Sequence, residues 1–266
     1  MRAVDFMYDG ILLSSFGLII GDFSGGNDLD TVDTDSQRTF ESFNMFNGKW
    51  QPLSVTTYKD TLRINISVVK NPCDQEDMTI SLSDIRRVKR WLNRPSYHEL
   101  RIIDDEYEGI FWMGSANVEE VHSNGVCVGF DLTFTTDRPF ALADTVTFSG
   151  NVNAGDQIEI NDVSDEEGFI YPDIQITVGE ACDLSITNDT DNRTMLIKNC
   201  EQNEVINISK SLFITTDSNT HKISDDFNWK FLRINNSYSN RLNTLTFSNA
   251  CSYVISYNPI VKAVIA

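Results

Sequence analysis

Apolar and polar side chains alternate over much of this chain, and this period-two pattern restricts it to folds built from β-strands. In the stretch "VCVGFDLTF" (126–134) every second residue is apolar and is predicted to face one side: Val126, Val128, Phe130, Leu132 and Phe134. The stretch "TLRINISVV" (61–69) repeats the same spacing. Because successive side chains of a strand point to opposite faces of a sheet, both stretches are predicted to be half-buried strands.

Shorter runs of the same kind fill the second half of the chain, for example "DIQITV" (173–178) and "SYVISYNP" (252–259). Turn-forming pairs such as Asp-Asn and Asn-Pro separate these runs. Short strands at close spacing indicate antiparallel sandwiches rather than βαβ units. The sequence therefore predicts a mainly β fold with two antiparallel β-sandwich domains, the first of which carries one short α-helix and a long hairpin.

A domain boundary is predicted near residues 144–155. The stretch "SGNVNAGDQ" (149–157) consists mostly of small and polar residues, which is typical of a linker. A new series of strands begins soon after it, with "GFIYPDIQI" (168–176). The first domain is accordingly predicted to span residues 1–146 and the second residues 152–266.

One segment, "LSDIRRVKRWLNRP" (82–95), has the spacing of an amphipathic helix. Four apolar residues recur at intervals of three and four and are expected on one face, beside Trp91: Leu82, Ile85, Val88 and Leu92. Ser81 or Ser83 can cap the start of this helix, and Asp84 suits the positive end of its dipole. Asn93, Arg94 and Pro95 are expected to end it.

The chain is strongly acidic, with a formal net charge of −18 over 266 residues. This charge argues against a protein that grips DNA or anionic lipid, because both are polyanions. The longest apolar stretch (11–20) contains serine and glycine and is about half the length of a membrane span. The N-terminus shows no signal-peptide pattern, so synthesis in the cytosol is expected.

No residue pattern indicates catalysis, a cofactor or a metal. The five cysteines are widely spaced without a C-x-x-C, which makes a zinc site or a disulfide framework improbable. His98, His122 and His221 lie in no metal-binding spacing and are interpreted as strand or loop residues. A Ser/His/Asp triad has candidate residues, but no G-x-S-x-G elbow supports one, and no phosphate-binding loop occurs. We therefore predict that the protein is not an enzyme.

Two acidic runs have alternative interpretations. Calcium is conceivable at the first run, which includes Asp28, Asp30, Asp33 and Asp35, because hard cations bind several carboxylates. The EF-hand pattern fails there, so a solvated loop is favoured. The second run, at 104–108, has apolar stretches on both sides, which favours a hairpin tip over a hydrolase carboxylate pair.

Aromatic residues alternate at Phe227, Trp229 and Phe231 in the second half. Trp229 could stack on a sugar ring, although such residues more often belong to a sandwich core. A carbohydrate-binding module in the second domain is therefore the alternative function.

Basic residues concentrate on the predicted helix, at Arg86, Arg87, Arg90 and Arg94, although the chain around them is acidic. The acidic surroundings, and the lack of an aromatic stacking platform, argue against a nucleic-acid contact. We expect the four arginines to meet carboxylates of the same or a neighbouring subunit. Desolvated pairs of this kind at an interface would set register and partner specificity.

Several segments, taken in order, resemble the distal tail proteins of long, non-contractile-tailed phages, the baseplate hub family. The segments that carry the resemblance are "FMYDGILLSSFGLII" (6–20), "RTFESFNMFNGKW" (38–50), "DIRRVKRWLNRPSYHELRIIDDEYEGIFWMGSANVEEV" (84–121), "GFDLTFTTDRPFAL" (129–142) and "YPDIQITV" (171–178). The turn before Trp50 departs from the family pattern, since relatives often have Pro-Gly there. The last segment resembles the start of the galectin-like C-terminal sandwich of many members.

The resemblance implies a structural protein of the tail tip, made in the cytoplasm of the host bacterium and encoded by a free phage or a prophage. It implies a homohexameric ring that docks the tail tube on one face and a tail-associated fibre or hub protein on the other. DNA would pass through the lumen without specific binding, and no membrane is involved. A host surface glycan is the partner under the alternative function, and a glycan hydrolase is the least favoured third hypothesis.

Overall fold

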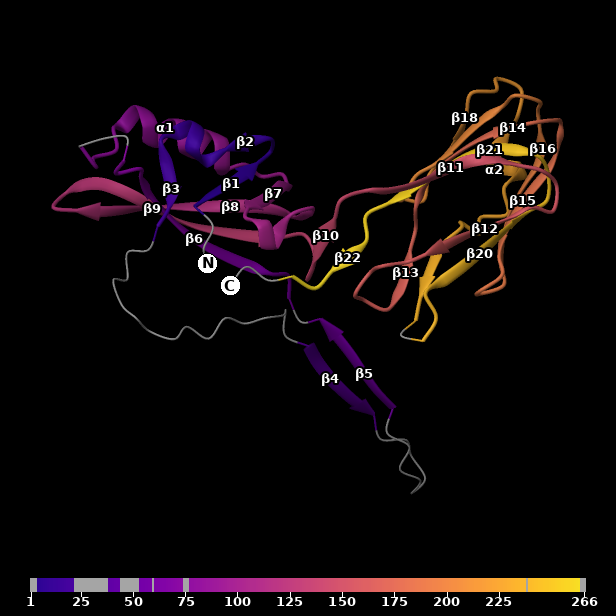
Figure 1. The fold of residues 1–266 in the computed structure, drawn as a ribbon, viewed down its shortest axis with the longest axis horizontal. Helices are drawn as coiled ribbons and strands as arrows, with labels where there is room; N and C mark the ends of the chain where they lie inside the picture. Colours follow the sequence, from indigo (N-terminus) through magenta and orange to yellow (C-terminus); the bar gives the residue numbers. More distant parts are fainter. Residues whose placement is uncertain are drawn as a thin grey trace. The chain divides into compact units, whose positions relative to one another are not determined.

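A computed structural model describes residues 4–21, 38–43, 53–58, 60–73, 77–237 and 239–263 (Figure 1). The acidic run at 28–35, with its calcium alternative, lies outside these residues. The chain forms two compact units. The first contains the residues up to Ala143 together with the segment from Val261, and the second is Asp144–Ile260. The second unit is thus inserted between two segments of the first.

The first unit is built on a nine-stranded sheet in which β2, β1, β7, β8, β9, β6 and β3 follow one another, while β10 pairs with β8 and β22. Its strands are β1 (Asp5–Tyr8), β2 (Ile11–Leu12), β3 (Leu18–Ile20), β6 (Arg63–Lys70), β7 (His98–Ile103), β8 (Ile110–Ser123), β9 (Val126–Thr136), β10 (Ala141–Ala143) and β22 (Ile260–Val261). Two short 3-10 helices, Leu13–Phe16 and Asp105–Tyr107, each join two strands that are consecutive in the chain. The second of these forms the tip between β7 and β8, where the sequence predicted a hairpin.

The helix α1 (Leu82–Leu92) lies where the sequence predicted it. The hydroxyl of Ser81 accepts a hydrogen bond from the backbone N–H of Asp84 at 3.2 Å, which caps an otherwise unpaired donor. The helix buries Ile85, Val88, Trp91 and Leu92 against the sheet. Leu82, in contrast, is 73% exposed, so its predicted place on the apolar face is wrong. It stands in the first turn, where the polar cap side chains also lie.

Aromatic rings hold α1 to the N-terminal strands. The indole of Trp91 stacks on Phe16 with 4.6 Å between ring centroids and on Phe6 with 5.7 Å. Its Nε1–H donates a hydrogen bond of 2.9 Å to the backbone carbonyl of Tyr8, so the one polar atom of the ring is satisfied. This arrangement fixes the rotation of the helix about its own axis.

The long hairpin β8–β9 turns through Asn124 and Gly125, both of which have positive φ, as a two-residue hairpin turn requires. Phe130, Leu132 and Phe134 are buried, as the alternation predicted. Toward the turn the pairing shifts between Val121 and His122, which marks a β-bulge. Beyond the bulge Cys127 is buried and Val126 is exposed, so the predicted facing is wrong there. An extra residue in one strand reverses which side chains face inward.

Two strands of the first unit form a sheet of their own. The strand β4 (Arg38–Phe43) pairs antiparallel with β5 (Leu53–Tyr58), and among the described residues neither strand pairs with a third. A two-stranded ribbon by itself has little stability in water.

The second unit is a β-sandwich. Its five-stranded sheet has the order β11, β21, β14, β17, β18, its four-stranded sheet has the order β12, β20, β15, β16, and β13 pairs with β19. These strands are β11 (Val146–Val152), β12 (Gln157–Asn161), β13 (Gly168–Ile170), β14 (Asp173–Val178), β15 (Cys182–Asn188), β16 (Arg193–Cys200), β17 (Val205–Ile208), β18 (Ile214–Thr216), β19 (Ile234–Asn236), β20 (Leu242–Phe247) and β21 (Cys251–Tyr257). A single turn of helix, α2 (Ile223–Asp226), precedes Phe227.

Both sheets of the second unit contribute to one apolar core. Ile176 and Ile255 come from the five-stranded sheet, and Ile186 and Leu245 from the four-stranded sheet, and all four are fully buried. The predicted mainly β class is therefore confirmed. The predicted linker is wrong, because Val146–Val152 pairs with β21 along its whole length. Small and polar residues suit a strand whose side chains are half exposed.

No helix in the described part of the chain has the length and apolar character needed to cross a membrane.

Candidate functional site

The arginines of α1 fall into two groups. Arg86 and Arg90 are exposed, and no partner is found for either among the described residues. Arg87 reaches Asp84 at 3.5 Å and lies over the ring of Phe16 at 5.4 Å. The solvent side of the helix therefore presents two guanidinium groups that are available for another molecule.

Arg94 has a different role, within the chain. Its Nη1 is 2.9 Å from Oδ2 of Asp9, and its guanidinium lies 5.3 Å from the ring centroid of Tyr8. The hydrogen bond from Arg94 lowers the pKa of the Asp9 carboxyl below its ordinary value. Arg94 thus ties the end of α1 to the β1–β2 turn. Arg87 and Arg94 thus meet carboxylates of the same chain, Asp84 and Asp9.

The remaining basic residue of the helix, Lys89, points toward the sheet. Its Nζ lies 2.5 Å from Oε1 of Glu120 on β8, and Oε2 of the same carboxylate is 2.9 Å from Nε2 of His122. The bonds from Lys89 and His122 lower the pKa of Glu120, which keeps this carboxyl ionised.

The other two histidines also lie beside carboxylates. Nδ1 of His98 is 3.3 Å from Asp9, at the surface of the first unit. His221 is buried in the second unit, with Nδ1 at 2.7 Å from Glu204, and both side chains are 1% exposed. Nε2 of His98 also lies 2.7 Å from the hydroxyl of Ser96, so Ser96, His98 and Asp9 contact one another in the order of a Ser/His/Asp triad. Among the described residues, no serine side chain contacts the ring of His221.

Trp229 follows α2 and is 58% exposed. Phe227 and Phe231 beneath it are buried, and their ring centroids lie 5.7 Å and 6.4 Å from the indole. Trp229 has φ of 56°, a left-handed conformation that is costly for a bulky residue. The interpretation that all three rings belong to the core is correct for the two phenylalanines only.

A shallow groove of about 280 Å³ lies on the outer face of the five-stranded sheet of the second unit. One row of side chains crosses four strands at its floor: Val254, Gln175, Asn207 and Thr215. The amide of Gln175 donates to Oδ1 of Asn207 at 3.0 Å, and the 71% exposed ring of Phe213 lines one side. Trp229 is not among the residues that line the groove. Sequence reasoning missed this groove, because the strands that form it are far apart in the chain.

One solved structure shows the class of the fold, which this chain shares with a phage adsorption-apparatus hub. The crystal structure of the Dit protein of phage SPP1, described as a hub of the adsorption apparatus in phages that infect Gram-positive bacteria, matches with a TM-score of 0.64. The match has 11% sequence identity and covers 97% of this chain and 99% of that one. The baseplate of phage P2 in its activated conformation with Ca also matches, with a TM-score of 0.47, 9% identity and coverage of 99% and 100%.

The family follows from the sequence models. A model of a phage tail protein N-terminal domain matches residues 1–138, and a model of a phage tail C-terminal domain matches residues 140–257. The chain therefore belongs to this family of phage tail proteins, which makes it a component of the virion tail. No curated protein matches it significantly. The predicted likeness to phage distal tail proteins is confirmed by the family and by the fold.

Proposed function

We propose that this protein is the structural hub of a phage tail tip, where six copies form a ring. The first unit would form the ring, and the second unit would project from it. One face would dock the tail tube and the other the tail-associated fibre or hub protein, after synthesis in the host cytoplasm. The observation that carries the proposal is the fold shared with a hub protein over 97% of the chain.

The separate β4–β5 ribbon supports self-assembly. Its two strands pair only with each other among the described residues. A two-stranded ribbon is marginally stable by itself, and at its end the ring of Tyr58 lies 6.4 Å from that of Phe140 in the first unit. We infer that the ribbon also packs on a neighbouring copy in the assembled particle. That contact would link consecutive subunits around the ring.

The exposed arginines of α1 supply a second argument. Arg86 and Arg90 stand on the same helix, one turn apart, without partners among the described residues. The chain offers 39 acidic residues against 21 basic ones, so a second copy is rich in complementary groups. Ion pairs desolvated at such a contact would fix the register of one copy against the next.

The net charge of −18 per chain fits a channel for DNA. An acidic surface repels the phosphate backbone, and a passage should not retain the molecule that moves through it. We propose that DNA passes the lumen of the ring without specific binding.

Charge reversal on α1 tests the ring. The double variant Arg86→Glu plus Arg90→Glu should lower the mass of the purified protein from six chains to one, measured by native mass spectrometry. The matched control is Lys198→Glu plus Lys210→Glu, which makes the same charge change at exposed positions of the second unit and should leave six chains. If the helix variant still forms rings, the role given to Arg86 and Arg90 is wrong.

Carbohydrate binding by the second unit is the second candidate function. Two observations favour it: the strained, exposed Trp229, and the groove whose floor carries the amides of Gln175 and Asn207. Ligand pockets combine aromatic side chains with a few placed polar groups, and in this groove Phe213 lies with these two amides. Fold alone does not establish such binding.

Binding of the full chain to purified host cell-wall glycan would test this candidate. Trp229→Ala and Gln175→Ala are made separately, and the one that abolishes binding identifies the surface used. Tyr97→Ala, which removes an exposed ring in the first unit, is the control and should bind normally. Absence of binding by the unmodified chain would reject the candidate.

A further inference from the structure

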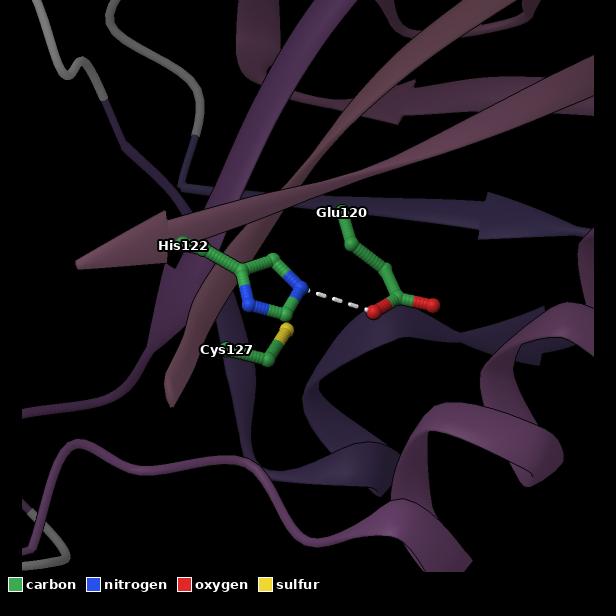
Figure 2. Close-up of side chains that lie close together, drawn as sticks. All are labelled: Glu120, His122 and Cys127. Atoms are coloured by element: carbon green, nitrogen blue, oxygen red, sulfur yellow. Dashed lines mark hydrogen bonds and ion pairs between the residues drawn. The ribbon is translucent and has the colours of Figure 1, made fainter. Parts of the chain in front are cut away.

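The end of the β8–β9 hairpin carries three side chains that can all ligate a metal. Glu120 and His122 lie two residues apart on β8 and therefore share a face of the hairpin. Cys127 on β9 is the cross-strand partner of His122. The three side chains come together beside α1, in the part of the sheet where the apolar core ends (Figure 2).

The β-bulge is what brings the thiol to this face. Glu120 pairs with the buried Phe130, so it lies on the inner face of the sheet. Unbroken alternation would place Cys127 on the opposite face, three residues from Phe130. The shift of register between Val121 and His122 turns it inward, where it is 4% exposed. Bulges often serve to re-aim one side chain next to a functional site.

The donor atoms are already close to one another. The sulfur of Cys127, a ring nitrogen of His122 and a carboxylate oxygen of Glu120 all lie within 4.8 Å of each other. In Figure 2 the thiol lies beside the imidazole ring, and the carboxylate faces the same ring. Two ligands of a tetrahedral Zn²⁺ are roughly 3.5 Å apart, given bonds of roughly 2.0 Å to nitrogen and 2.3 Å to sulfur. Small side-chain rotations would close the remaining gap.

Lys89 supports the carboxylate without occupying the site. Its ammonium binds Oε1 of Glu120, which leaves Oε2 directed toward His122. A ligating carboxylate is commonly held by a second group in this way. The Lys89–Glu120–His122 contacts alone are explained as an ion-pair network, but such a network gives no reason for a bulge that adds a buried thiol.

We propose that Glu120, His122 and Cys127 form a binding site for a zinc-class divalent cation. Thiolate and imidazole select Zn²⁺ and its chemical relatives over Mg²⁺ and Ca²⁺, which prefer oxygen. Binding would replace the thiol proton of Cys127, which is now directed to the carbonyl of Gly129 at 3.4 Å, and would release it to solvent. Water, or a side chain of another subunit, would complete a tetrahedron. The ion would brace the hairpin against α1.

Cobalt provides a direct test, because Co²⁺ bound to a thiolate gives an intense charge-transfer absorption. The full-length, metal-stripped chain is titrated with Co²⁺, and the band should saturate at one equivalent and disappear when Zn²⁺ is added. Cys127→Ser should abolish the band, and His122→Ala should weaken Co²⁺ binding about tenfold or more. Cys73→Ser, which alters an exposed thiol elsewhere, should change neither.

A thermal melt keeps the test independent of folding defects. Zn²⁺ should raise the Tm of the unmodified chain and of Cys73→Ser, and should leave the Tm of Cys127→Ala unchanged. The proposal is overturned if no cobalt–thiolate band forms, or if the band persists in Cys127→Ser. Neither result bears on the ring, because metal binding is expected of a single chain as well.

Discussion

The two units of this protein differ in how deeply their ion pairs are buried. The second unit buries an acid–base pair, His221 and Glu204, whose side chains are both 1% exposed. The first unit leaves Arg86 and Arg90 in solvent, without partners in the described part of the chain. Under the proposed function, these two arginines meet another copy of the chain.

The interiors of the two units also differ in the interactions that hold them together. In the second unit Asn243 is fully buried, and its Oδ1 accepts from Asn188 and from the backbone of Asn235, each at 2.8 Å. Its Nδ2 donates to the carbonyls of Asn235 and Arg241. The first unit is held instead by stacked rings around Trp91. A satisfied polar network specifies one geometry for the strands that it joins.

The largest expected effect comes from breaking the buried pair of the second unit. Glu204→Ala removes the acceptor of His221, of Thr216 and of the Glu201 backbone N–H. The unfolding free energy of the second unit should fall by about 3–5 kcal/mol, because one member of a buried pair is left without its partner. Urea denaturation of the full chain measures this change.

Thiol alkylation shows which unit opens in that variant. Burial raises the pKa of Cys200 to about 12, so this thiol should react only when the second unit unfolds. The control Glu159→Ala alters an exposed carboxylate of the same unit and should change stability by less than about 0.5 kcal/mol. Equal stability of Glu204→Ala and the control would contradict the contrast between the units.

A smaller effect is expected from the asparagine network. Asn243→Ala leaves the side chain of Asn188 and the backbone N–H of Asn235 without their acceptor. An orphaned buried group costs about 1–3 kcal/mol, so the second unit should lose that much stability in the same urea assay. Gln175→Ala, on the exposed face of the same unit, is the control. A loss no greater than that of the control would mean that the network is replaced by water at no cost.

The smallest effect distinguishes the arginines of the first unit from one another. Arg94→Ala removes a cation–π contact with Tyr8 that is worth about 0.5–1 kcal/mol, and also the ion pair with Asp9. Arg86→Ala should leave the stability of the single chain unchanged, because this side chain has no partner among the described residues. The two melts, recorded below the concentration at which rings form, make the comparison. If the two variants lose equal stability, the distinction between a paired Arg94 and an unpaired Arg86 is wrong.

The stability that Arg94 contributes should depend on pH in a definite direction. Arg94 lowers the pKa of Asp9 in the folded chain, so the ion pair stabilises the fold above the ordinary carboxyl pKa of about 3.9. That contribution is lost as the pH falls through the lowered value. The unmodified chain should therefore lose more stability on acidification than Arg94→Ala does.

Local pattern predicted much of this fold. The strand at 61–69 and the helix at 82–92 depend on spacing that a single segment carries, and both lie where expected. The facing of Cys127 and the strand at Val146–Val152 could not be predicted in this way. The first depends on a bulge, and the second on pairing with β21, about one hundred residues further along the chain.

The candidate sites likewise depend partly on patterns within one segment and partly on the tertiary structure. The sequence located the basic helix, but only the structure shows that Arg94 turns back to Asp9 while Arg86 does not. The groove needs four strands in register, and the Glu120–His122–Cys127 cluster needs a bulge. Neither register nor bulge is encoded in the spacing of residues within one segment.

The most direct test of the central claim is the mass and symmetry of the full chain in solution, by native mass spectrometry and electron microscopy at micromolar concentration with the tail tube protein present. The account predicts sixfold rings with the mass of six chains, held through the first unit, with the second unit folded in each copy. A protein that remains a single chain under these conditions would contradict it.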